Sequence, residues 1–239
     1  MKLSVVIPCY NEARNIPLIL DRFGEVVGDK EVESKDIEVV LVDNGSTDDT
    51  PEVLRDLLAG YPFARTVRVD VNQGYGFGIL SGLQEANGEF LGWTHADMQT
   101  DPKDTIKALR LIESAPEPQR SFVKGNRKGR PVSDVFFTLG MGLFESLYLG
   151  VNLRDINAQP NLFHRSFFES WEDPPHDFSL DLYAFVLARK RGLDVIRFPV
   201  RFPKRIHGHS KWNVDWRSKW KFILRTLKYS AGLKRRLKG

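Results

Sequence analysis

The chain has 239 residues, 41% of them hydrophobic, and a formal net charge of +4, which is enough length and apolar content to bury a sizeable core. The single cysteine, Cys9, excludes an internal disulfide framework and fits a reducing compartment. No stretch approaches the roughly 20 apolar residues of a membrane-spanning helix, and the N-terminus lacks a signal-peptide pattern, so we expect a cytoplasmic protein.

Strand and helix patterns alternate through the first hundred residues. Short apolar or β-rich runs indicate strands, and apolar residues at helical spacing indicate helices between them. In chain order the sequence predicts a strand at 3–8, a helix at 16–27, a strand at 37–43, a helix at 46–58, a strand at 66–71, a helix at 75–86 and a strand at 89–94. This alternation predicts parallel strands with crossover helices, an open α/β sheet.

A polar cluster follows each of the four predicted strands. These clusters are Tyr10-Asn11-Glu12, Asp43-Asn44-Gly45-Ser46, Asn72-Gln73-Gly74 and His95-Ala96-Asp97. In open α/β sheets, ligands bind beyond the carboxyl ends of the strands. We therefore expect the four clusters to converge on one binding edge.

The second half of the chain is less regular. Its patterns predict a basic, glycine-bearing loop at 125–130, an apolar helix at 135–149 that lies near a membrane or is simply packed, a loop or strand at 154–165, a helix at 177–191 and a strand at 195–205. No internal repeat or low-complexity linker is visible. We expect one domain over residues 1–211, followed by a segment of different character at 212–239.

The C-terminal segment is strongly basic. From Lys204 onward there are twelve lysines and arginines against one acidic residue, Asp215, and Trp212, Trp216 and Trp220 lie among them at near-helical spacing. Such a helix suits a membrane surface, with cations facing anionic lipid, or it folds back on the domain. Nucleic acid is not expected as a partner, because no nucleic-acid-binding module accompanies the basic residues.

Three potential ligands alternate after the fourth predicted strand. His95, Asp97 and Gln99 would point the same way in an extended chain. A carboxylate with neighbouring donors can hold Mg²⁺ or Mn²⁺, which in turn holds a diphosphate. Alternatively, polar residues at a strand end serve only solubility.

Five ordered motifs give this triplet its context. They are residues 5–12 (VVIPCYNE), 42–48 (VDNGSTD), 72–76 (NQGYG), 96–102 (ADMQTDP) and 205–211 (RIHGHSK). With them the chain resembles the family 2 glycosyltransferases of GT-A fold, in particular the polyprenyl-phosphate sugar transferase branch that includes dolichol-phosphate mannose synthase. The resemblance implies a GT-A fold and transfer of a sugar from a nucleotide sugar with inversion at the anomeric carbon.

The resemblance also implies roles for individual residues. The nucleotide and donor sugar would be bound by Pro8, Tyr10, Glu12, Asp43, Asn72, Gly74, Ala96 and Asp97, and the cation by Asp97, Gln99 and His95. Donor and acceptor phosphates would be bound by Arg127, Arg130, Arg205, Ser210 and Lys211. Helix capping is the alternative role for Glu12 and Asp43, and we expect Lys124 and Lys128 to be ordinary solvated residues.

The chain departs from the family pattern at two places. His95 replaces the first aspartate of the metal motif, and histidine can coordinate Mn²⁺ but suits Mg²⁺ poorly. Residues 157–160 (NAQP) replace a serine-glycine-phenylalanine-arginine stretch, with His164-Arg165 as candidates for the missing arginine. Asp97 is the central catalytic candidate, and Asp155 or Asp181 could position the acceptor or act as a base.

The acceptor separates the possible functions. A lipid monophosphate is already a nucleophile, so positioning and electrostatics suffice, whereas a saccharide hydroxyl, as in O-antigen or capsule assembly, requires a general base. A third possibility is a nucleotide-sugar-binding scaffold whose metal site has degraded. Fuller synthases of this branch carry membrane spans after the last motif, so their absence here predicts peripheral attachment at the cytoplasmic face, or a separate membrane-protein partner.

Overall fold

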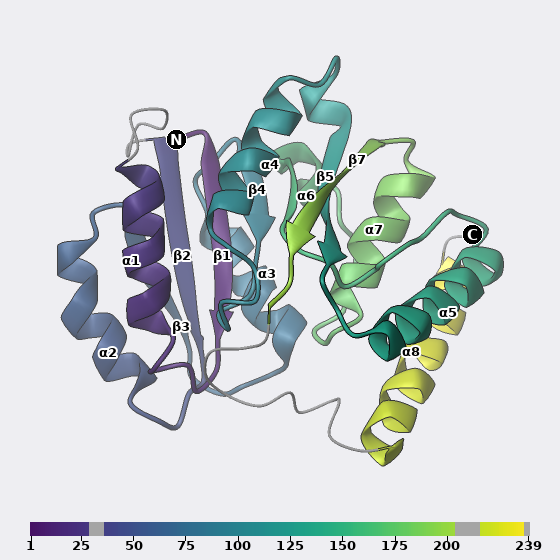
Figure 1. Cartoon of the computed structure of the whole chain (residues 1–239), viewed down its shortest axis with the longest axis horizontal. Coiled ribbons are helices and arrows are strands. Elements are labelled where there is room, and N and C mark those ends of the chain that lie inside the picture. Colours follow the sequence, from purple (N-terminus) through teal and green to yellow (C-terminus); the bar gives the residue numbers. More distant parts are fainter. Residues whose placement is uncertain (29–35, 204–215, 237–239) are drawn as a thin grey trace.

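The computed structural model describes residues 1–28, 36–203 and 216–236 (Figure 1). Its centre is a seven-stranded sheet in the order β3-β2-β1-β4-β6-β5-β7. The strands are β1 Leu3–Cys9, β2 Ile37–Asn44, β3 Ala64–Val69, β4 Phe90–Trp93, β5 Ser121–Lys128, β6 Asn161–His164 and β7 Asp194–Arg201. The helices are α1 Ile16–Val27, α2 Thr50–Leu57, α3 Tyr75–Glu85, α4 Lys103–Glu113, α5 Val132–Leu149, α6 Arg165–Glu169, α7 Leu180–Lys190 and α8 Trp216–Arg236.

The first four strands are parallel, as the alternation of strand and helix predicts. β1 lies between β2 and β4, and β2 pairs with β3. β6 runs antiparallel to both β4 and β5, whereas β5 and β7 are parallel. The sheet is therefore mostly parallel with one reversed strand, which confirms the α/β class.

Helices cover both faces of the sheet, and the strands are apolar on both sides for that reason. In β1, Val5 and Ile7 belong to the hydrophobic cluster formed with α1 and α4, whereas Val6 belongs to the cluster formed with α3 and α7. Successive side chains of a strand point to opposite faces, so one strand contributes to both cores. The sheet is thus the middle of three layers (Figure 1).

Most of the basic run at 125–130 is strand and not the predicted loop, which is confined to Gly129 and Arg130. Residues 121–128 form β5, paired with β7 up to Lys128. Gly125 lies inside this strand. The position requires glycine because a Cβ there would lie 2.1 Å from the Gln159 carbonyl oxygen. The glycine therefore allows a close backbone approach inside the sheet, and it does not mark a turn.

α5 and α8 lie side by side at one end of the molecule (Figure 1). Gly142, Glu145 and Leu149 are the buried residues of α5. On α8, Thr226, Ser230 and Leu233 are buried, and Leu233 belongs to the cluster shared with α3 and α7. One face of the C-terminal helix therefore packs on the domain, as one of the two alternatives for this segment predicts.

Candidate functional site

The first two polar clusters are joined by hydrogen bonds at the carboxyl edge of the sheet. The Asn11 backbone N–H donates to Ser46 Oγ at 3.1 Å, and Thr47 N–H donates to Asn11 Oδ1 at 2.9 Å. Glu12 N–H donates to Thr50 Oγ1 at 2.9 Å, at the start of α2. The loops after β1 and β2 therefore form one unit, with Tyr10 and Glu12 in it.

Asp43 and Asn44 connect this unit to the third cluster. Asp43 is 2% exposed, and its Oδ1 accepts from Ser46 N–H at 3.0 Å. Asn44 Nδ2 donates to the Gly74 carbonyl at 2.9 Å, and Asn72 Oδ1 accepts from Gly74 N–H at 2.9 Å. The clusters after β1, β2 and β3 thus converge, as the topology requires.

Gly74 has a backbone conformation that other residues rarely adopt. Its φ is +115°, and a Cβ there would lie 2.4 Å from the His176 carbonyl oxygen. We expect Gly74→Ala to lower the free energy of unfolding by about 2 kcal/mol or more, because the strained backbone alone costs roughly 1–3 kcal/mol. Urea denaturation measures this, and Gly60→Ala, whose Cβ would meet nothing within 4 Å, is the matched control. Equal stability of the two variants would contradict the prediction.

The segment after β4 bends, so His95, Asp97 and Gln99 do not lie in the extended chain that their alternation predicts, whereas their role as metal ligands stays a prediction. β4 ends at Trp93, and Met98 has a positive φ of 58°. Asp97 Oδ1 accepts from Gln99 N–H at 3.1 Å, and the Gln99 side chain donates to the Pro203 carbonyl at 2.9 Å. The His95 ring lies 6.2 Å from the ring of Tyr75. The bend therefore links Asp97 to Gln99 through one hydrogen bond and places the His95 ring near Tyr75.

The donor set at this edge fits a sparsely held cation better than a closed cage. Across the described residues, no three or more His, Cys, Asp or Glu side chains gather as a metal site. Asp97 is 5% exposed and follows β4, next to β1 in the sheet. Mg²⁺ and Mn²⁺ sites that hold diphosphates need only one or two protein carboxylates. Asp97 fits that single role, and Ala96 beside it is also buried.

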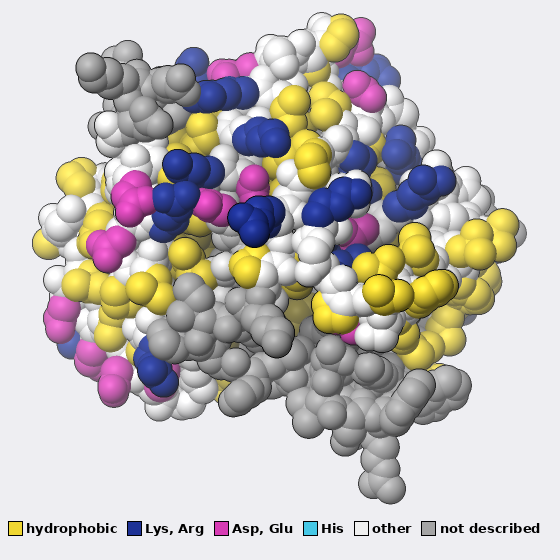
Figure 2. Space-filling model, in the orientation of Figure 1, with side chains coloured by type: hydrophobic (Ala, Val, Ile, Leu, Met, Phe, Trp, Pro, Cys, Tyr) yellow, Lys and Arg dark blue, Asp and Glu magenta, His cyan; other side chains and the backbone are white. Residues whose placement is uncertain are grey.

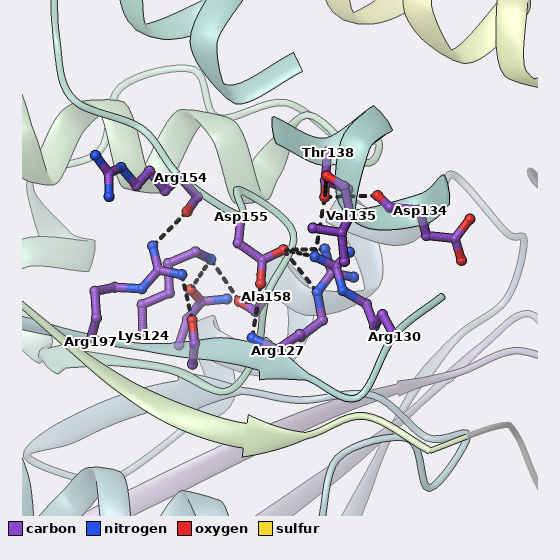
Figure 3. A network of polar contacts seen from close by, with 12 residues as sticks. Lys124, Arg127, Arg130, Asp134, Val135, Thr138, Arg154, Asp155, Ala158 and Arg197 are labelled. Atoms are coloured by element: carbon purple, nitrogen blue, oxygen red, sulfur yellow. Dashed lines mark hydrogen bonds and ion pairs between the residues drawn. The ribbon is translucent and has the colours of Figure 1, made fainter. Parts of the chain in front are cut away.

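Arg127 and Arg130, the two predicted phosphate-binding residues that the structure describes, meet at Asp155 (Figure 3). Arg127 donates to Asp155 through its backbone N–H at 2.9 Å, through Nε at 2.9 Å and through Nη2. Arg130 Nη2 lies 3.4 Å from the same carboxylate and donates to Thr138 Oγ1 of α5 at 3.1 Å. Burial raises the pKa of Asp155, but the hydrogen bonds and charge of Arg127 outweigh it and hold that pKa below the usual value. A carboxylate bound in this way is a weak base, so its contacts fit anchoring.

Asp181 has a different environment. It is 3% exposed at the start of α7, and its Oδ1 accepts from Trp93 Nε1 at 3.2 Å and from Asn161 Nδ2 at 3.0 Å. Burial raises the pKa of Tyr75 well above the usual value, and the charge of Asp181 adds to that rise. The Tyr75 hydroxyl also contacts the Gln159 side chain. Asp181 therefore lies close to the end of β4, within a hydrogen-bonded group.

Lys124 was expected to be solvated, and that expectation is wrong. Its side chain is 0% exposed, and Nζ donates to the Ala158 carbonyl at 2.7 Å and to Asn161 Oδ1 at 2.6 Å. The sequence holds one signal of this burial, which is that Lys124 continues the apolar run of Phe122 and Val123. A lysine in a run that predicts a strand buried on both faces has to find internal acceptors.

His164-Arg165 does not supply the missing arginine. Because β6 is antiparallel to β4, residues that follow β6 lie at the opposite edge of the sheet. There Arg165 donates to the Gly88 carbonyl at 2.6 and 3.0 Å and to the Ala86 carbonyl at 2.7 Å. The predicted phosphate-binding residues Arg205, Ser210 and Lys211 lie outside the described residues.

The chain is similar in sequence to known glycosyltransferases. The profile of the family described as "Glycosyl transferase family 2" matches residues 4–172. Among curated proteins, the undecaprenyl-phosphate 4-deoxy-4-formamido-L-arabinose transferase of Photorhabdus laumondii is 26% identical over 219 residues, and that of Edwardsiella ictaluri is 28% identical over 217 residues. Each match covers 89% of this chain, and the chain spans 63% of the length of these relatives.

Solved structures share the fold. Glucosyl-3-phosphoglycerate synthase from Mycobacterium tuberculosis, solved with Mn²⁺, UDP and glucosyl-3-phosphoglycerate, aligns with a TM-score of 0.71 at 20% identity, covering 97% of this chain and 80% of that one. A mannosyltransferase from Pyrobaculum calidifontis, solved with GDP-mannose and Mn²⁺, aligns with a TM-score of 0.70 at 21% identity, covering 96% and 64%. Both are GT-A glycosyltransferases, so the predicted GT-A architecture is confirmed.

Proposed function

The chain belongs to glycosyl transferase family 2, and from that premise we propose that it transfers a sugar from a nucleotide-diphosphate sugar to a lipid phosphate at a membrane surface. The donor would bind where the loops after β1, β2 and β3 converge, with Tyr10 and Glu12 near the base and Asp43 at base or ribose. The carboxyl ends of parallel strands are where such sheets bind their ligands. The curated relatives named above, which act on undecaprenyl phosphate, support the acceptor class.

A divalent cation would be held by Asp97, with His95 as the next candidate ligand. When bound, Mg²⁺ or Mn²⁺ neutralises charge that builds on the leaving diphosphate. Because an imidazole ligand suits Mn²⁺ better than Mg²⁺, coordination by His95 would favour Mn²⁺ as the bound ion. Gln99 donates to the Pro203 carbonyl through its amide nitrogen, and its amide oxygen is the atom that would bind the cation.

The acceptor phosphate would be bound beside Arg127 and Arg130. Asp155 orients the Arg127 guanidinium, so less conformational entropy is lost when an anion binds. A phosphate oxygen that attacks the anomeric carbon needs no deprotonation, so the contribution of these residues is positioning and charge compensation. One in-line displacement inverts the anomeric configuration.

The observation that carries the lipid acceptor is the exposed apolar face of α5. This helix begins two residues after Arg130 and carries its large apolar side chains outward: Val132 71% exposed, Phe136 71%, Leu139 54%, Leu143 64%, Phe144 45% and Leu147 77%. Figure 2 shows hydrophobic side chains gathered over α5, near lysine and arginine side chains. Soluble proteins rarely expose so continuous an apolar patch without a partner, and a cationic border favours an anionic bilayer.

α5 would lie along the membrane. By length and composition it is the one helix of the described residues that could cross a bilayer, contrary to the expectation that no stretch approaches this. However, Ser146 Oγ accepts from Leu153 N–H at 2.9 Å, so the chain turns back against the helix at once. The chain then returns to β6, which pairs with β5, the strand that precedes α5. An interfacial helix at the cytoplasmic face satisfies this connection.

We expect the triple variant Phe136→Ser/Leu143→Ser/Leu147→Ser to bind anionic vesicles at least about tenfold more weakly, because each exposed side chain contributes on the order of 1–2 kcal/mol when buried in lipid. Co-sedimentation with phosphatidylglycerol vesicles measures this. Val71→Ser removes a 70% exposed apolar side chain away from α5 and is the control for vesicle binding. Unchanged vesicle binding by the triple variant, with unchanged thermal stability, would refute the membrane assignment.

A saccharide acceptor is the second candidate, and the buried carboxylate of Asp181 is the observation that favours it. A hydroxyl nucleophile needs a base, and Asp181 is bound by the neutral donors Trp93 and Asn161, whereas Asp155 is paired with the Arg127 cation. Incubation with sugar nucleotides and either polyprenyl phosphate or oligosaccharide separates the two. Formation of a lipid-linked product that survives base but not mild acid supports the lipid phosphate, and product formed only on the oligosaccharide refutes it.

A further inference from the structure

Three cations from β5 and β7 hold the segment between α5 and β6 from beneath (Figure 3). Arg197 Nη1 donates to the Arg154 carbonyl at 2.5 Å, Arg127 binds Asp155, and Lys124 donates to the Ala158 carbonyl. Of these, Lys124 is the most deeply buried and has no role in the proposed transfer. Its second acceptor, Asn161, connects it to Asp181.

The chemistry of Lys124, Asn161 and Asp181 determines which group donates and which accepts in each hydrogen bond between them. An ammonium can only donate hydrogen bonds, so the Asn161 side chain has to present its carbonyl oxygen to Lys124. The amide NH₂ of Asn161 then faces Asp181, where it donates at 3.0 Å. Trp93 Nε1, which is also donor-only, faces the same carboxylate oxygen. Asp181 Oδ1 therefore accepts from two N–H donors, Trp93 Nε1 and the Asn161 amide.

We infer that Lys124 is a positioning residue, which orients the Asn161 amide so that its NH₂ group donates to Asp181 beneath the donor site. Tyr75 begins α3, the helix that follows Asn72 and Gly74, and its hydroxyl donates to Asp181. The network therefore also fixes the position of a side chain next to the proposed donor site. This inference rests on the proposed function for its catalytic consequence, but its hydrogen-bond order stands on geometry alone.

The charged surroundings agree with this assignment. Burial lowers the pKa of Lys124 to about 7, against the opposing charge of Asp181, and Arg197, Asp155 and Arg127 are the other charged groups that face it. A neutral amine keeps two N–H donors, which match its two acceptors, Ala158 and Asn161. Lys124 can therefore hold the amide in the same orientation on either side of that pKa.

The decisive variant is Asn161→Asp, which keeps the size of the side chain and the acceptor for Lys124. It replaces the donor to Asp181 by a second carboxylate, and two adjacent carboxylates retain a shared proton to higher pH. We expect the acidic limb of the kcat profile to move up by about one pH unit or more. In the resting enzyme, ¹³C NMR of the aspartate carboxyls is expected to show the same shift.

Lys124→Met tests the other end of the network. We expect kcat to fall on the order of 10- to 100-fold with little change in the KM of the donor, as for other residues that orient a functional side chain. Lys128→Met, which removes an exposed lysine from the same strand, is the matched control. If Lys124→Met does not fold, Asn161→Asp still decides the question.

The two proposals can fail separately. Coincident carboxyl titrations and pH profiles for the wild type and Asn161→Asp would overturn the role of Lys124. A wild-type enzyme that transfers no sugar to any acceptor would overturn the proposed function, and the carboxyl titration would still test the hydrogen-bond order.

Discussion

Asp97→Ala is expected to reduce sugar transfer to background, a loss on the order of 10³-fold or more, because it removes the carboxylate that would hold the cation and with it the compensation of the leaving diphosphate. Asp97 is the carboxylate of the bend after β4, and the bend places it at the converging edge. Transfer of radiolabelled sugar by the purified protein measures the loss. Binding of UDP or GDP should lose its dependence on Mn²⁺ in the same variant, as measured by calorimetry.

Asp101→Ala is the matched control, since Asp101 belongs to the same motif but binds elsewhere. Its carboxylate accepts from Arg22 Nε at 3.0 Å and Nη2 at 2.8 Å, and from Lys103 N–H at 3.0 Å. Its loss should cost about 1 kcal/mol of stability and leave transfer largely intact, because exposed ion pairs and caps contribute at that level. Activity that persists in Asp97→Ala would remove this edge from the mechanism.

The sequence predicts the first half of the fold well because local pattern and topology agree there. Helix 16–27 is predicted to the residue, and the first four strands lie within two residues of their predicted ends. Parallel strands have to bring their carboxyl ends together, so the convergence of the clusters around Asn11, Asp43 and Gly74 follows from the alternation alone.

The second half is less predictable because its contacts are long-range. No pattern was assigned to α4, and the strand character of Gly125 depends on Gln159, which is 34 residues away. The family resemblance identifies the arginines at Asp155. The pairing of Lys124 with Asn161 depends on the antiparallel strand β6, which no local sequence pattern predicts. Single-sequence patterns do not encode such partners.

Asp155→Asn is expected to have the second largest effect, this time on stability. The substitution keeps the size of the side chain but removes the carboxylate that Arg127 and Arg130 share in the described part of the chain, where each arginine side chain is 8% exposed. Removing one partner of a buried ion pair typically costs about 3–5 kcal/mol. Urea denaturation measures the loss, and Asp134→Ala, which removes a partly exposed carboxylate from the first turn of α5 whose charge also acts on Arg130, controls for the loss of a nearby negative charge.

The loss should depend on pH in a defined direction. Because the pKa of Asp155 is lower in the folded protein than its usual value of about 3.9, its contribution is complete above that value and disappears as pH falls through the folded pKa. The stability difference between the wild type and Asp155→Asn should therefore be constant near neutral pH and shrink below about pH 4. A difference that does not change with acid would show that the charge of Asp155 is not its source.

Inorganic phosphate gives an independent test of the same cluster. If Asp155 compensates cations that also bind an acceptor phosphate, the variant exposes an anion site, and phosphate at about 100 times its Kd should restore roughly 2.7 kcal/mol. Chloride at equal ionic strength controls for screening. Selective rescue by phosphate would show that the arginines form an anion site, whereas equal effects of both salts would limit Arg127, Arg130 and Asp155 to a structural ion pair.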